Sequence, residues 1–185
     1  MMALYLMFVV ALWVALTWAL WRLWRRWRAV EGANRRLRDS LAIVLGALWF
    51  GVSFWYGGGR KYYYDWQIER LCAKDGGIKV YETVKLPAEK FDKWGSAQIP
   101  RNDMAKPGEE YYYQMDVRYY RQGDPDMYRL SFQIVRRADG KLLGKATSYG
   151  RRGGDLPGPW HPSAFGCPSG ADITDLKKQV LASTR

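Results

Sequence analysis

Two long stretches without a charged residue constrain this chain more than any other feature of its sequence. One extends from Met1 to Trp21 and the other from Ser40 to Gly59. Each has the roughly 20 residues that a helix needs to cross a bilayer core of about 30 Å. Because a small soluble domain rarely holds two helices that are apolar on every side, the sequence predicts a membrane anchor in residues 1–59, with transmembrane helices at about 2–21 and 40–57.

The order of charge and hydrophobicity around the first stretch separates an anchor from a signal peptide. A cleaved signal peptide begins with a basic segment and ends with small residues at its cleavage site. Here the apolar stretch comes first, and the basic sequence WRLWRRWR follows it at residues 21–28. We therefore expect the first helix to remain as an uncleaved anchor.

The charge of the connection between the two stretches predicts the orientation. Residues 22–39 contain many arginines against only Glu31 and Asp39, and short loops rich in Lys and Arg stay in the cytoplasm. The segment after Gly59 is also basic, but long domains cross the membrane largely regardless of charge. We therefore expect a two-pass protein of the bacterial inner membrane, with its N-terminus and its C-terminal domain in the periplasm.

Tryptophan and arginine interleave where the first stretch ends, at Trp21, Arg22, Trp24, Arg25, Trp27 and Arg28. Indole rings prefer the membrane interface, and arginines extend from it toward lipid phosphates. The pattern predicts contact with the lipid bilayer and with anionic lipid. Nucleic acid is a less favoured partner, because this most cationic segment lies against the membrane.

The ends of the two helices can also be predicted. We expect the first helix to run past the hydrocarbon and the turn to lie near Glu31, Gly32, Ala33 and Asn34, with an N-cap for the second helix at Asp39 or Ser40. Small residues recur at four-residue spacing, as Ala42 with Gly46 and Ala47 with Gly51. Such spacing lets helices approach closely in lipid, and it fits packing against the first helix as well as dimerisation.

Residues 60–185 have the composition of one small folded domain that follows a glycine hinge at Gly57–Gly59. Arg60–Asp75 has no helix breaker and is closed by two glycines, which predicts a helix with a glycine stop. Alternation predicts a strand at Ile78–Val84, and residues 86–102 hold a helical turn within a long connection. The predicted class is a transmembrane hairpin followed by a small periplasmic α+β domain.

Three segments, EYYYQMDVRYY, MYRLSFQIVRR and KLLGKATSY, predict an antiparallel β-meander within this domain. In the middle segment Tyr128, Leu130, Phe132 and Ile134 alternate with Arg129, Ser131 and Gln133, as a sheet with one buried face requires. Asp139 and Gly140 predict a tight two-residue hairpin turn. A loop is expected at 150–170, and a final amphipathic helix places Ile173, Leu176, Val180 and Leu181 on one stripe.

The two cysteines, Cys72 and Cys167, lie far apart in the sequence and match no CxxC or CxxH metal pattern. In a periplasmic domain a disulfide between them is the simplest account. Two free buried thiols are the alternative. No metal or other cofactor is expected. His161 can be paired with Cys167 or Ser163 as a nucleophile and base, but a structural or surface histidine is the favoured interpretation, since nothing indicates a third, orienting group.

Two surfaces are candidates for binding. Alternation along the first strand of the meander exposes Tyr112 and Tyr120 and turns Tyr111, Tyr113 and Tyr119 inward, and exposed tyrosines anchor protein interfaces or stack on sugars. Arg151 and Arg152, beside two glycines in YGRRGGD, can present guanidinium groups and backbone amides to a phosphate or a carboxylate. Ordinary strand filling and a solvated loop are the alternatives.

No nucleotide, metal or catalytic motif is present, and the acidic pairs lie in loops that do not fix their geometry. The leading hypothesis is therefore a non-enzymatic, membrane-anchored binding module, such as an accessory subunit of an envelope complex that binds another envelope protein. An immunity or exclusion protein against a periplasm-acting toxin or phage component is the second hypothesis. An enzyme acting on lipid or cell-wall material, with Arg151, Arg152 and His161 near its site, is the third.

Overall fold

A computed structural model describes residues 2–29, 34–156, 158 and 161–184, and the chain forms two compact units. The first unit contains Met1–Arg60 and Asp155–Pro162. The second contains Lys61–Gly154 and Ser163–Arg185. The division into an anchor at 1–59 and a domain at 60–185 stays a prediction, because Asp155–Pro162 belong to the first unit.

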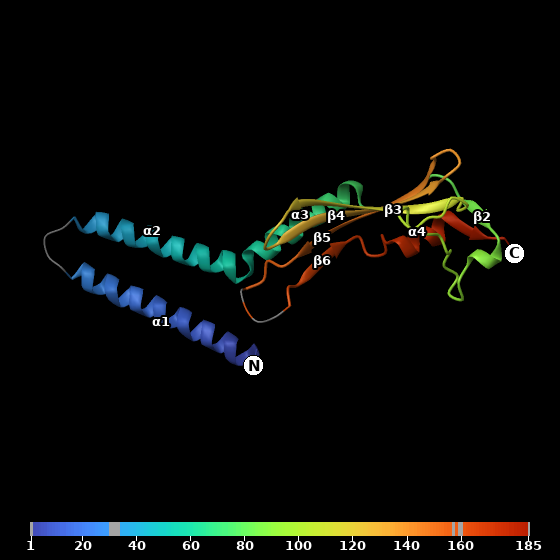
Figure 1. Cartoon of the computed structure of the whole chain (residues 1–185). Coiled ribbons are helices and arrows are strands. Elements are labelled where there is room, and N and C mark those ends of the chain that lie inside the picture. The colour runs from blue at the N-terminus through green and yellow to red at the C-terminus, as the bar shows by residue number, and fades with distance from the viewer. Residues whose placement is uncertain (1, 30–33, 157, 159–160, 185) are drawn as a thin grey trace. The chain divides into compact units, whose positions relative to one another are not determined.

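The first unit is built on α1 (Met2–Arg28) and α2 (Arg35–Phe54), which run side by side in opposite directions (Figure 1). Both are long and apolar enough to cross a membrane, as the uncharged stretches predict. Their large apolar side chains remain outside any protein core, and Phe8 and Ile43 are 64% and 72% exposed. Helices that are apolar on every side are typical of membrane spans and of the buried cores of large proteins.

The ends of these helices differ from the predicted bounds. α1 continues through the basic residues to Arg28, and α2 begins at Arg35 after Asn34, so the predicted N-cap at Asp39 or Ser40 is wrong. Arginine and leucine are good helix formers, and Arg38 Nη1 donates to the Trp27 carbonyl oxygen at 2.9 Å. Of the predicted turn residues, Glu31, Gly32 and Ala33 lie outside the described part of the chain.

Polar side chains tie α1 to α2 at two levels. Trp13 Nε1 donates to Ser53 Oγ at 3.0 Å, and Trp49 Nε1 donates to Thr17 Oγ1 at 3.2 Å. A Cβ atom added at Gly46 or Gly51 would meet no described atom within 4 Å. Gly46 and Gly51 therefore do not pack closely against α1, which was one of the two expected roles of the small residues.

The glycine hinge is a break within continuous helical structure. A π-helical turn, η1 (Trp55–Gly59), joins α2 to α3 (Arg60–Asp75), and Gly58 has a φ of 147° that interrupts the helical conformation. Only glycine adopts such a φ without strain. The predicted helix at 60–75 is confirmed, and its stop is formed by the Gly76 amide, which donates to the Cys72 carbonyl oxygen at 2.8 Å.

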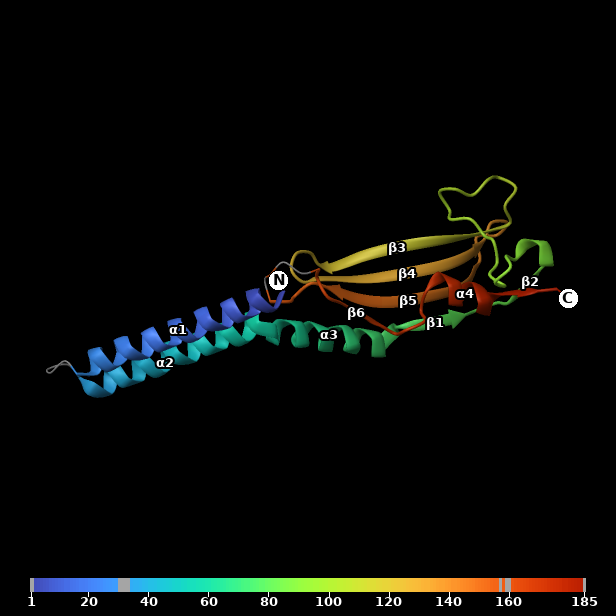
Figure 2. The same cartoon turned by 90° about the horizontal axis from the view of Figure 1, so that it is seen from below.

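The second unit contains an antiparallel sheet in the order β1-β5-β4-β3, with β6 paired to β5 (Figure 2). The predicted meander is confirmed as β3 (Tyr111–Arg121), β4 (Asp126–Arg136) and β5 (Leu142–Arg152). β1 (Gly77–Val80) lies at one edge and β3 at the other. The β4–β5 hairpin has a five-residue connection in which Gly140 alone takes a positive φ, so the predicted two-residue turn is too short.

Three other predicted elements need correction. The strand expected at Ile78–Val84 is split, because the Tyr81 and Glu82 amides both donate to the Leu143 carbonyl oxygen and end β1. β2 (Val84–Leu86) then pairs in parallel with β7 (Leu181–Ser183), so Leu181 belongs to a strand instead of the last helix. The loop expected at 150–170 contains the end of β5 and the short strand β6 (Ala164–Cys167). The expected helical turn is present as η2 (Ala88–Lys90).

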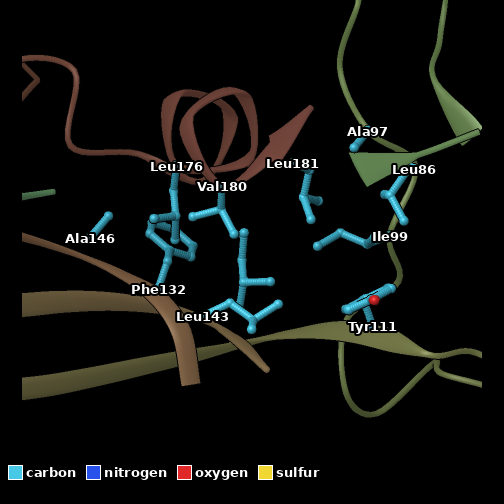
Figure 3. Close-up of a cluster of buried hydrophobic side chains, with 11 residues drawn as sticks. Leu86, Ala97, Ile99, Tyr111, Phe132, Leu143, Ala146, Leu176, Val180 and Leu181 are labelled. Carbon is cyan, nitrogen blue, oxygen red and sulfur yellow. The ribbon is translucent and has the colours of Figure 1, made fainter. Parts of the chain in front are cut away.

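The main core lies between the sheet and α4 (Ile173–Val180), whose N-cap Asp172 accepts from the Asp175 amide. Phe132 and Ile134, from the predicted buried face of β4, belong to the same buried cluster as Leu176 and Val180. Figure 3 shows Phe132 beside Leu176 in this cluster. The other face is not simply exposed, since Ile68 of α3 packs on Met127 and Tyr149 in a second cluster. The prediction of a single buried face is therefore wrong where α3 covers the sheet.

Candidate functional site

Arg151, a predicted anion ligand, is fully buried at the end of β5. Its Nε donates to Asp65 Oδ1 on α3 at 2.5 Å, and its Nη1 contacts the Gly153 carbonyl oxygen and Ser163 Oγ. Arg152 is exposed, because consecutive residues of a strand point to opposite faces. The structure therefore does not bring the two arginines together around one site, and binding by Arg152 stays a prediction.

The glycine turn after these arginines engages its amides within the chain. Gly153 donates its amide to the Ser163 carbonyl oxygen at 2.8 Å, and Gly154 donates to Asp124 Oδ1. Both glycines have positive φ values, 88° and 81°. The turn thus has the backbone form expected for anion binding, while the carboxylate that its Gly154 amide meets belongs to the protein.

Cys72 on α3 and Cys167 on β6 lie at disulfide distance, with Cα atoms 6.0 Å apart and 95 residues between them in sequence. The predicted pairing therefore fits the geometry. It fastens α3 to the sheet beside the Ile68 cluster. Because the pair uses the Cys167 sulfur, that atom is not available as a nucleophile for the exposed His161.

The predicted tyrosines of β3 have unequal environments. Tyr112 is half-buried with Arg137 over its ring at 5.3 Å, and Tyr120 is 46% exposed and stacks on Tyr149 with ring centroids 6.2 Å apart. Tyr111 and Tyr113 pack inward as expected. Tyr119 does not, since it is 50% exposed. The register shifts just after Tyr119, and α4 contacts the sheet nearer Phe132.

Tyr149 belongs to a polar cluster that sequence patterns do not reveal. Its hydroxyl donates to Asp75 Oδ1 at 2.5 Å, and Arg129 Nη2 lies 3.5 Å from Asp75 Oδ2. Burial, followed by the hydrogen bond to Asp75, raises the pKa of the Tyr149 hydroxyl well above its usual value. The cluster holds the end of α3 on the sheet.

β3 forms one edge of the sheet in the second unit (Figure 2). Near its start, Tyr113 exchanges backbone hydrogen bonds with the preceding loop, at 3.0 Å to the Pro100 oxygen and 2.9 Å from the Asn102 amide. Beyond this point β3 pairs only with β4 among the described strands. Met115, Val117 and Tyr119 are 46%, 39% and 50% exposed there, on the same face of the sheet as α4 but outside the core cluster that α4 covers.

A polar cavity of about 470 Å³ lies on the opposite face of the same strand, lined by Arg101, Asn102, Asp103, Gln114, Met115, Asp116, Ser131 and Gln133. Arg101 and Asp103 pair with each other, which lowers the pKa of the Asp103 carboxyl. Ser131 is only 3% exposed, and its Oγ has no hydrogen-bond partner among the described residues. The cavity therefore retains unused hydrogen-bonding capacity beside Asp116.

In the first unit the predicted interface residues form a ladder of cation–π contacts along α1. Arg22 lies over Trp18 at 5.1 Å, Arg25 over Trp21 at 4.8 Å and Arg28 over Trp24 at 5.3 Å. Trp27 is 44% exposed, and its carbonyl oxygen accepts from Arg38. This arrangement keeps the rings and the cations at one end of the helix, as an interfacial segment requires.

Comparison with protein-family models, with curated proteins and with solved structures gives no match for this chain. The chain's own surfaces therefore carry the evidence for its function. Within the described residues, no three His, Cys, Asp or Glu side chains are grouped so that they hold a metal ion. The open edge of β3, with its exposed apolar side chains, is the candidate functional site.

Proposed function

We propose that this chain is a non-enzymatic protein-binding module of the bacterial inner membrane. In this proposal α1 and α2 span the bilayer, and the second unit lies in the periplasm, where the edge of β3 accepts a strand from a partner protein. Strand addition to an open sheet edge is a common mode of recognition, in which main-chain hydrogen bonds give affinity and alternate side chains give specificity.

The open edge of β3 is the observation that carries the proposal. Natural proteins protect long strand edges, because unpaired amides and carbonyls invite association. β3 is an 11-residue strand, and Met115, Val117 and Tyr119 expose apolar atoms along it. An edge with these properties is best explained by a partner that covers it.

The membrane position rests on two observations in the first unit. α2 buries no residue within the described chain, and α1 has the basic, tryptophan-rich end that interfaces favour. The arginines at this end support a cytoplasmic turn, and in this proposal the second unit then lies in the periplasm. The expected contact with anionic lipid belongs to the same arginines.

The proposal is tested by blocking the edge without harming the sheet. Since the Tyr113 amide and carbonyl point away from β4, those of Val117 do so too, because the direction repeats every second residue. Val117→Pro therefore removes only an outward amide, which an edge strand tolerates. Arg118→Pro is the matched control, since it removes an amide that faces β4 and should destabilise the domain.

The measurement is cross-linking of the full chain in its own membranes, followed by purification and identification of the products. We expect Val117→Pro to keep the thermal stability of the natural chain and to lose its cross-linked protein partners. Unchanged partners in a folded Val117→Pro protein would show that the edge is not the docking site.

A further inference from the structure

We infer that the strand docked on β3 is β3 of a second copy of this chain, paired antiparallel about Val117. The inference depends on the proposed function, because it names the partner of the same edge. It follows from the order of side chains along Gln114–Tyr120 and from the charge of Asp116, which forms no ion pair among the described residues.

The direction of the backbone groups defines which residues can pair. The outward hydrogen bonds of Tyr113 place the amides and carbonyls of Met115, Val117 and Tyr119 on the open edge. In an antiparallel pair centred on Val117, the two copies of Val117 bond to each other. Met115 of each copy bonds to Tyr119 of the other copy.

The charged residues select this centre over its neighbours. With Val117 at the centre, Asp116 of each copy lies opposite Arg118 of the other, at a non-hydrogen-bonded position where side chains come closest. A centre at Asp116 places two carboxylates opposite each other, and a centre at Arg118 places two guanidinium groups opposite each other. A centre at Met115 requires the edge of Tyr113, which the loop at Pro100 and Asn102 already occupies.

The monomer leaves these charges poorly matched. Arg118 lies directly opposite Arg129 on β4, and like charges in that position repel. Arg129 already contacts Asp75 at 3.5 Å, whereas no ion pair joins the Asp116 carboxylate to any residue that the structure describes. Two Asp116–Arg118 pairs across the edge would give the Asp116 carboxylate an ion-pair partner. They would also offset the repulsion between Arg118 and Arg129.

The polar cavity and the apolar face support the same register. Asp116 lies at the cavity that holds the unpartnered Ser131 Oγ, and the second copy brings the donors of Arg118 to this place. On the other face, each exposed Met115 meets Tyr119 of the second copy, and sulfur–aromatic contacts are favourable. On each face of the sheet, the side chains of one β3 strand are therefore complementary to those of the same strand in the second copy.

The decisive experiment exchanges the charges in the full chain. Asp116→Arg alone and Arg118→Asp alone should each weaken dimerisation by about tenfold or more, because each places two like-charged pairs across the edge. The double variant Asp116→Arg/Arg118→Asp should dimerise as the natural chain does. A mixture of the two single variants should form mixed dimers, which a merely destabilised domain would not do.

Cysteine cross-linking tests the register by itself. Two Val117 Cα atoms in a hydrogen-bonded pair lie about 5.5 Å apart, within disulfide range. Val117→Cys should therefore cross-link to itself under mild oxidation, while Asp116→Cys and Arg118→Cys should do so only with each other.

The outcomes separate this inference from the proposed function. A monomeric chain whose partners are still lost in Val117→Pro would overturn self-pairing and leave edge docking in place. A chain that shows neither dimers nor partners at this edge would overturn both. A dimer that is insensitive to the charge exchange would overturn the register.

Discussion

Asp65 and Arg151 form an ion pair that joins the first turns of α3 to the end of β5. The Arg151 side chain is 1% exposed and the Asp65 side chain 18% exposed, with Nε and Oδ1 2.5 Å apart. A guanidinium group in this position needs its carboxylate, because an unpaired buried charge is costly. The packing of α3 on the sheet therefore depends on the ion pair between Asp65 and Arg151.

Removal of the carboxylate should show this dependence. We expect Asp65→Ala to lower the free energy of unfolding by about 3–5 kcal/mol, since it leaves the Arg151 charge buried without its partner. Arg152→Ala, at the exposed neighbouring position, should change it by about 0.5 kcal/mol or less. Urea unfolding of both proteins in detergent measures the difference. Equal effects would contradict a structural role for the pair.

The disulfide should contribute substantially to stability. Cys72 and Cys167 close a loop with a sequence separation of 95 residues, and loss of a native disulfide typically costs about 2–5 kcal/mol. We expect the double variant Cys72→Ser/Cys167→Ser to lose this amount in thermal or urea unfolding. Reductant should destabilise the natural chain and leave the variant unchanged. A natural chain unaffected by reductant would mean that the bond is absent.

Gly144 lies close to α4. A Cβ atom there would lie 2.4 Å from Val180 Cγ2 and 3.2 Å from Leu176 Cδ1. Gly144→Ala should therefore cost about 1–3 kcal/mol by overpacking the core. Gly108→Ala is the matched control, because a Cβ at Gly108 meets nothing within 4 Å. Similar melting temperatures for the two variants would argue against the α4 packing.

Acid should weaken one contact of the β4–β5 hairpin. Hydrogen bonds from Lys141 and then Arg136 lower the pKa of the Glu82 carboxyl below its usual value of 4.5. A lowered pKa stabilises the fold above pH 4.5, and this contribution disappears as the pH falls through the lowered value. The stability difference between the natural chain and Glu82→Gln should therefore shrink from pH 6 toward about pH 3. A constant difference across this range would exclude the ionised contact.

Much of the fold could be predicted because its signals are local. The uncharged stretches, the helix at Arg60–Asp75 and the three meander strands each depend on composition or alternation within one segment. The split of Ile78–Val84 and the strand β6 could not be predicted, because long-range partners decide them. Leu143 accepts from Tyr81 and Glu82, and β5 pairs with Ala164–Cys167.

The candidate site was only partly visible in the sequence. The predicted exposure of Tyr112 and Tyr120 indicated a binding surface on β3, but alternation alone does not show that this strand forms the edge of the sheet. The role of Arg151 also depends on Asp65, which lies 86 residues away in the sequence. The strand order β1-β5-β4-β3 is a property of the folded chain. It determines which strand lies at the edge of the sheet and which side chains stay accessible to a binding partner.

The most direct test of the account is the sidedness and redox state of the cysteines in intact cells. A membrane-impermeant thiol reagent is applied before and after reduction, and before and after permeabilisation of the inner membrane. The account predicts that Cys72 and Cys167 are labelled only after reduction and without inner-membrane permeabilisation, because they are paired in a periplasmic domain. Labelling without reduction, and only after the inner membrane is opened, would place the domain in the cytoplasm and contradict the account.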